Sequence, residues 1–138
     1  MNKLEMLIAC IEHYSYLKDV PGNQVFVSFA QKGVLTMLLD SYDVFRDMDI
    51  GFFMGVIDGY VENTIDAEEK HYIHYEERKK KLPQVVASIM KQYNMDEIKA
   101  LEQFYLSDTG ALFSQDTSEL YKKTPEELFA LYVQEQEK

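Results

Sequence analysis

The chain has 138 residues, which suits one domain or two small units sharing a core and is too short for a TIM barrel or a two-domain dinucleotide-binding enzyme. Apolar residues make up 46% of it and charged residues 28%, which excludes wholesale disorder. Its 24 acidic and 14 basic residues give a net charge of −10, which argues against nucleic acid as a direct ligand because this charge would repel a phosphate backbone.

Cysteine usage and hydropathy indicate the compartment. The single cysteine, Cys10, cannot form an internal disulfide, and seven methionines without a disulfide framework fit a reducing environment. Glu5, Glu12 and His13 interrupt the apolar residues near the start, so no signal-peptide core is expected there. No stretch approaches the ~20 apolar residues that span a bilayer. We therefore expect a soluble, cytoplasmic protein with no membrane partner.

The first segment has the spacing of an amphipathic helix of about four turns, with Glu12 and Lys18 outside its apolar stripe. The stripe consists of Leu4, Leu7, Ile8, Ile11 and Ser15. Proline and glycine then break the pattern at residues 19–23, because proline cannot continue the hydrogen-bond ladder.

Three further helices are predicted before the charged middle of the chain. Asn23 is expected to cap a short helix that stops at Gly33, where a left-handed residue costs little. Apolar spacing then predicts helices over residues 35–45 and 50–62.

The middle of the chain is dominated by charge. In residues 66–81, acids precede bases by three or four positions, the favourable order for pairs on a helix surface. The pattern predicts a solvated connecting helix that ends at Leu82-Pro83, because the residue before a proline is pushed out of the helical region. We therefore divide the chain into an N-terminal helical domain (1–64), a charged helical connector (65–82) and a C-terminal helical domain (83–138).

The last part of the chain again has helical spacing. A helix is expected to begin near Pro83 and to end at Asn94, and Asp96 is expected to open the next one. After Ser107-Asp108-Thr109-Gly110, residues 111–121 are predicted to be irregular.

The clearest local signal is Thr124-Pro125-Glu126-Glu127, which combines a threonine cap, a proline at the first helical position and a glutamate that completes a capping box. No alternating run of β-branched residues requires a strand. The predicted fold class is all-α, with six to eight short amphipathic helices in two packed halves.

Both halves of the chain contain short motifs that carry a further signal. In the first half these motifs are Cys10-Ile11-Glu12-His13-Tyr14, Gly33-Val34, Ser41-Tyr42 and Ile57-Asp58-Gly59-Tyr60. In the second half they are Glu102-Gln103-Phe104-Tyr105-Leu106-Ser107-Asp108-Thr109, Leu120-Tyr121, Thr124-Pro125 and Leu131-Tyr132. Together they resemble two short bacterial helical domain families of unknown function, whose members are often encoded beside an ADP-ribosyltransferase-like protein. The resemblance implies a non-catalytic, antitoxin-like partner that restrains, or is modified by, a neighbouring enzyme, and it carries no catalytic residue.

One cluster has the residue types of a metal site. Glu68, His71, His74 and Glu77 form E-x-x-H and H-x-x-E steps, like half of a helical di-metal carboxylate site. Steps of three residues drift by about −60° each on a helix, so Glu68 and Glu77 would end on opposite faces. The histidines would need carboxylates from another helix or a partner. The interpretation is a solvated helix face, with no metal and no cofactor.

Two further groups have candidate nucleophiles. Cys10 lies near His13 in sequence, but a cysteine at the edge of an apolar stripe behaves as a small hydrophobe with a raised pKa. The hydroxyl-rich residues 107–118 lack a nearby base that would accept a proton, so they are expected to cap helices and turns.

Aromatic residues indicate a different kind of site. The chain has ten tyrosines and eight phenylalanines and no tryptophan, and some tyrosines must lie near the surface because each hydroxyl needs a partner or water. Aromatic side chains on an acidic surface are typical of protein contacts. The candidates for interaction are Phe52, Phe53, Tyr60 and Tyr121.

The sequence thus predicts a non-enzymatic helical module that binds another protein, one that is basic and encoded nearby. A homodimer is a further possibility. The alternative is a small-ligand- or metal-binding enzyme built on a helical bundle, whose site would draw on the metal candidates or on residues 108–116.

Overall fold

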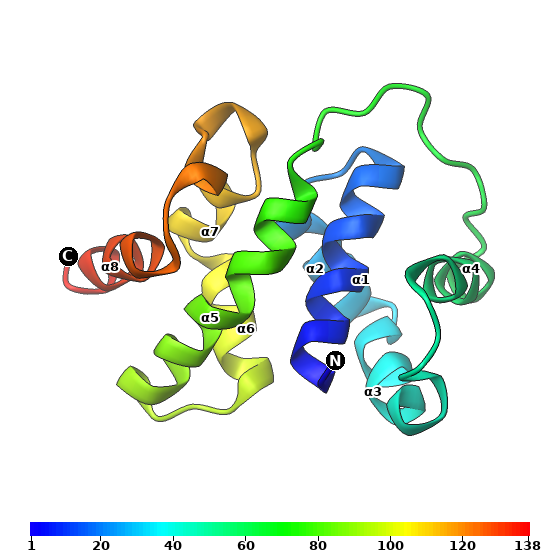
Figure 1. The fold of residues 1–138 in the computed structure, drawn as a ribbon, viewed down its shortest axis with the longest axis horizontal. Coiled ribbons are helices and arrows are strands. Elements are labelled where there is room, and N and C mark those ends of the chain that lie inside the picture. Colours follow the sequence, from blue (N-terminus) through cyan, green and yellow to red (C-terminus); the bar gives the residue numbers. More distant parts are fainter.

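The computed structural model describes residues 1–138 and contains eight α-helices, two short 3₁₀ helices and no β-strand (Figure 1). The elements are α1 (Lys3–Lys18), α2 (Gly22–Gln31), α3 (Val34–Phe45), α4 (Ile50–Val61), α5 (Tyr75–Tyr93), α6 (Glu97–Leu106), α7 (Asp108–Phe113), η1 (Asp116–Ser118), η2 (Leu120–Lys122) and α8 (Pro125–Gln136). The predicted all-α fold of six to eight helices is confirmed.

Helix α1 lies at the centre and packs against α2, α3, α4 and α5 (Figure 1). Its buried residues include Met6, Ala9 and Cys10, outside the predicted stripe, as well as Glu12 and Lys18. The expectation of a one-sided amphipathic helix is therefore wrong for α1. Neighbouring helices surround it, and its buried charged groups find partners on other elements.

Helix α5 corrects the prediction for the charged middle. The chain between α4 and α5, residues 62–74, is a loop, and α5 continues through Pro83 instead of ending before it. Pro83 lies inside α5 and has no N–H that could donate to the carbonyl of Lys79, so the helix lacks one backbone hydrogen bond at this point. Burial of the side chains on one face of α5 offsets the free energy that the missing hydrogen bond costs.

That buried face explains why α5 is not a solvated connector. Arg78, Leu82, Val85 and Ile89 are spaced by four, three and four residues, so they form one stripe, and all four are fully buried. The helix packs against α1, α6 and α8. One hydrophobic cluster of 27 buried residues, from Leu4 to Tyr132, therefore includes side chains from both predicted halves.

Several predicted helix ends are confirmed. Thr124 and Glu127 form the capping box of α8, and Asp96 caps α6 by accepting a hydrogen bond from the backbone of Lys99. Asn94 ends α5 in the left-handed conformation, with φ 52°.

Two local predictions are wrong. Asn23 lies inside α2, whose N-cap is Pro21. Residues 111–121 are not irregular, because they contain the end of α7, all of η1 and the start of η2. A glycine makes α7 possible: a Cβ at Gly110 would lie 1.8 Å from the carbonyl oxygen of Phe104. The backbones of α6 and α7 approach so closely that only glycine fits there.

Candidate functional site

A fully buried ion pair joins the two central helices. Nε of Arg78, in the first turns of α5, donates to Oε1 of Glu12, in the middle of α1, at 2.8 Å. Both side chains are 0% exposed. Charged groups enter a protein interior only when they are paired, so the two residues require each other.

The second oxygen of Glu12 is satisfied from α6. The hydroxyl of Tyr105 donates to Oε2 at 2.7 Å, and burial together with this carboxylate raises the pKa of Tyr105 well above its usual value. Gly22 closes the remaining side, because a Cβ there would lie 2.6 Å from Oε2. Burial raises the pKa of Glu12, and the positive charge of Arg78 opposes that rise.

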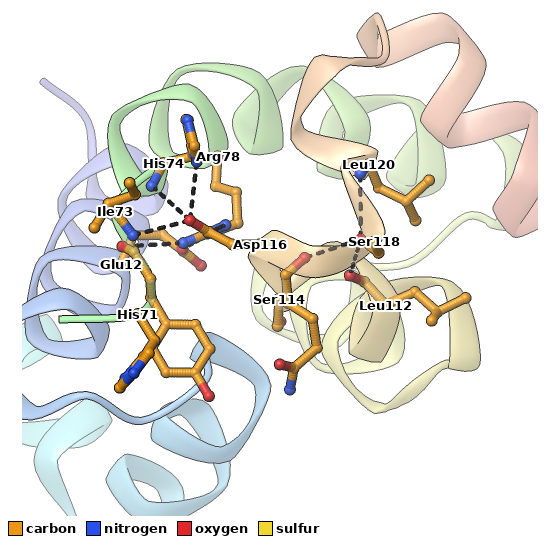
Figure 2. A network of polar contacts seen from close by, with 12 residues as sticks. Glu12, His71, Ile73, His74, Arg78, Leu112, Ser114, Asp116, Ser118 and Leu120 are labelled. Atoms are coloured by element: carbon orange, nitrogen blue, oxygen red, sulfur yellow. Dashed lines mark hydrogen bonds and ion pairs between the residues drawn. The ribbon is translucent and has the colours of Figure 1, made fainter.

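Asp116 of η1 extends the network toward the surface (Figure 2). Its Oδ1 accepts from Nη1 of Arg78 at 2.6 Å, and its Oδ2 lies 2.9 Å from Nδ1 of His74. The backbone N–H groups of Ile73 and His74 also donate to Oδ2. Burial alone would raise the pKa of Asp116, but the hydrogen bonds from Arg78 and His74 hold it below its ordinary value.

The guanidinium group of Arg78 is fully hydrogen-bonded within the network. All three guanidinium nitrogens of Arg78 are used, since Nη2 donates to the carbonyl of Tyr72 at 3.4 Å. The ring of His74 stacks on Tyr121, with ring centroids 3.9 Å apart. Surface grooves of about 590, 370 and 270 Å³ are lined by other residues than Glu12, Arg78 and Asp116. The hydrogen bonds and ion pairs of this network connect α1, α5, α6 and η1, which is the geometry of a structural contact between these elements.

A second buried cation holds the loop of residues 62–74. Nζ of Lys18, at the end of α1, donates to the carbonyls of Asn63 and Ile65 at 2.9 and 3.2 Å. It also pairs with Asp66 at 2.9 Å and with Asp58 of α4 at 3.2 Å. Burial alone would lower the pKa of Lys18, but these carboxylates outweigh it and raise the pKa.

The four metal candidates, Glu68, His71, His74 and Glu77, do not converge on one point in the structure. The ring of His71 pairs with Asp19 at 2.8 Å, and His74 pairs with Asp116, while Glu68 and Glu77 are exposed. No group of three or more His, Cys, Asp or Glu side chains is placed to hold a metal ion. The residues before Tyr75 are not helical, so the helix face expected for Glu68, His71 and His74 does not exist.

Cys10 is fully buried, and burial raises the pKa of its thiol to about 12. His13 packs on the rings of Tyr16 and Tyr75 and makes no hydrogen bond with the thiol. Burial lowers the pKa of His13. The predicted raised pKa of Cys10 is confirmed, and no activated nucleophile is formed here.

The hydroxyl-rich stretch caps helices, as predicted. Ser107 accepts a hydrogen bond from the backbone of Gly110 at 2.9 Å and so caps α7. Ser114 accepts from the backbone of Asn23 and donates to the carbonyl of Gly110. Glu135 of α8 was not anticipated: its carboxylate accepts from the first backbone N–H groups of α7.

The interaction candidates divide into two pairs. Phe52 is 37% exposed and Tyr60 is 51% exposed, so both reach solvent. Phe53 is 0% exposed within the core, and Tyr121 is 9% exposed beneath His74. Of the three successive large residues 52–54, Phe52 is the one that faces outward.

Glu12 and Arg78 were not recognised from the sequence, and Asp116 was named only as the end of the 108–116 stretch of the alternative site. A signal existed for Arg78, because it extends the stripe formed by Leu82, Val85 and Ile89 by one helical step. Glu12 lies among apolar residues on α1, which is a weaker signal. Asp116 gives none, because a 3₁₀ turn has no periodicity that would place it opposite α5.

Comparisons of the chain with family models, curated proteins and solved structures find no match. None of its helices combines the length and the apolar character needed to cross a membrane.

Proposed function

We propose that this protein is a non-catalytic helical module whose function is to bind a basic protein partner. The observation that carries the proposal is the set of large apolar side chains that remain exposed on a chain of net charge −10. They are Met1, Val44, Met48, Phe52, Tyr60, Ile65, Ile73, Leu106 and Leu112. Negative charge speeds the encounter with a basic partner, and apolar anchors supply affinity once they are covered.

The buried polar groups support the same proposal. Glu12, Arg78 and Asp116 satisfy one another, so their pairing maintains the fold and offers no group for general acid or base catalysis. A rigid scaffold of this kind lowers the entropy lost when its surface is bound.

The resemblance of the sequence motifs indicates which partner to test first, namely an ADP-ribosyltransferase-like protein encoded beside this chain. In that arrangement the chain would restrain the neighbouring enzyme, as an antitoxin restrains a toxin.

The test begins with crosslinking and mass spectrometry in native cells, followed by reconstitution of the crosslinked protein with this chain. The proposal predicts a stoichiometric complex. If the purified proteins do not associate, or if the crosslinks join only copies of this chain, the proposal is wrong. Sedimentation of the chain alone identifies a homodimer.

A further inference from the structure

The outer side of α3 has two adjacent stripes of different chemistry. Within α3, 100° per residue places Met37 and Val44 on one stripe and Asp40 and Asp43 beside it, and Asp47 follows in the turn after Phe45. Val44 is 74% exposed, and the three aspartates are exposed. A partner that lies along α3 would therefore meet an apolar ridge and a row of carboxylates side by side.

Two further large apolar residues are exposed where the chain passes from α3 into α4. Met48 is 46% exposed and Phe52 is 37% exposed, although both are large apolar residues. The rings of Phe45 and Phe52 pack edge to face, with centroids 5.0 Å apart, and Asp49 caps α4 by accepting from the backbone of Phe52. These contacts hold the corner in a fixed shape, and it lies at the end of the molecule opposite α8 (Figure 1).

The charge of this surface decides what can cover it. Four aspartates and one arginine occur between Asp40 and Asp49. An anionic membrane would be repelled, and so would the same surface of a second copy of the chain. A partner that carries basic side chains next to an apolar stripe would pair with the aspartates and at the same time cover the exposed apolar residues.

We propose that Val44, Met48 and Phe52, together with Asp40, Asp43 and Asp47, form a docking surface for a basic amphipathic helix of the partner protein. This inference rests on the proposed function and specifies its surface. Asp40 and Asp43 lie on α3 and Asp47 lies in the turn that follows it, so the site extends past the end of this helix and a partner helix of about three to four turns spans it. Its apolar residues cover Val44 and Phe52, and its lysines and arginines reach the aspartates.

The probe is a fluorescent synthetic peptide of about five helical turns, with leucines on one face and lysines beside them, and a second peptide with glutamate replacing each lysine. Fluorescence anisotropy with the full chain should show binding of the basic peptide and none of the acidic one. The double variant Val44→Ser/Met48→Ser should weaken binding about tenfold, as expected for the loss of central anchors. Asp40→Asn/Asp43→Asn/Asp47→Asn should weaken it similarly and reduce its salt dependence.

Matched controls separate this surface from general charge attraction. Leu106→Ser removes an exposed apolar residue elsewhere, and Glu97→Gln/Glu126→Gln/Glu137→Gln removes the same number of exposed charges. Both controls should bind the basic peptide within about twofold of the original chain. All substituted side chains are exposed, and a thermal melt of each variant confirms that it is folded.

Three results overturn the docking surface: equal weakening by the control and surface variants, no binding of the basic peptide, or binding of anionic phosphatidylserine vesicles that Val44→Ser/Met48→Ser abolishes. The reconstituted native complex distinguishes the two proposals. If it forms and both surface variants leave its affinity unchanged, this surface is wrong and the proposed function stands. If no native complex forms, the proposed function itself fails.

Discussion

Nε of Arg78 lies 2.8 Å from Oε1 of Glu12, and neither side chain is accessible to solvent. A buried ion pair adds little net stability, because the attraction between the charges is offset by the cost of removing both from water. Any packing arrangement that separates Arg78 from Glu12 would leave a buried charge without its partner, and that arrangement would be strongly destabilised. We interpret the pair as fixing the register between α1 and α5, and thereby the relation between the two halves of the chain.

Substitution of Arg78 by methionine tests this interpretation. Arg78→Met leaves the carboxylate of Glu12 buried without its cation, and should lower the free energy of unfolding by about 3–5 kcal/mol. The control Lys99→Met breaks an exposed pair with Glu102 and should cost about 0–1 kcal/mol. Urea denaturation measures both, and equal losses would contradict a structural role for the buried pair.

The hydroxyl of Tyr105 should contribute separately. Tyr105→Phe removes the donor to Oε2 of Glu12, and a hydrogen bond to a charged group is worth about 1.5–3 kcal/mol of unfolding free energy. Tyr132→Phe is the matched control, because Tyr132 is also buried but its hydroxyl bonds to no other residue, and its effect should stay within about 0.5 kcal/mol. A Tyr105→Phe protein as stable as the control would show that this bond contributes nothing.

Substitution by alanine should change the stability of the protein in opposite directions at two glycines. Gly110→Ala places a methyl group against the carbonyl of Phe104 and should destabilise the protein by about 3 kcal/mol or more. Gly55 lies inside α4 with no atom within 4 Å of an added Cβ, so Gly55→Ala should stabilise it by about 0.5–1 kcal/mol. Thermal or urea unfolding of the two variants provides the comparison. The same sign for both would refute the close approach of α6 and α7.

The loop of residues 62–74 should respond to pH through Asp19 and His71. A hydrogen bond from His71 lowers the pKa of Asp19 below its ordinary 3.8, and Asp19 raises the pKa of His71 above its ordinary 6.5. The contribution of Asp19 to stability is therefore present above pH 3.8 and is lost as the pH falls through its lower folded pKa. The contribution of His71 is present below pH 6.5 and is lost as the pH rises through its higher folded pKa.

An NMR titration of the imidazole signals tests this pair. In Asp19→Asn the pKa of His71 should move back toward 6.5, because the carboxylate that favours the charged ring is gone. The pKa of His13, which burial lowers, should not change. A His71 pKa unaffected by Asp19→Asn would mean that the two side chains do not pair in solution.

Local signals in the sequence were sufficient for much of the fold. The capping box at Thr124, the cap at Asp96 and the stop at Asn94 depend on residues within one helical turn, and the structure confirms all three. The continuation of α5 through Pro83 was not predictable in this way. It depends on tertiary burial of Arg78 and Leu82, which outweighs the local preference of a proline.

The buried network was beyond local reasoning for a related reason. Glu12 and Arg78 are 66 positions apart, and although Arg78 extends the apolar stripe of α5, nothing in either segment indicates that the two side chains pair. Only the packing of α1 against α5 brings them together. Three successive large side chains at residues 52–54 predict only that one of them faces outward, and the packing of α4 decides that it is Phe52 and not Phe53.

Whether this chain is an interaction module is decided by the affinity of its reconstituted native complex at low and at high salt. If the acidic surface guides a basic partner onto apolar anchors, the dissociation constant rises steeply with salt, yet the complex persists where charges are screened. An affinity independent of salt, or no complex at either ionic strength, would contradict the account.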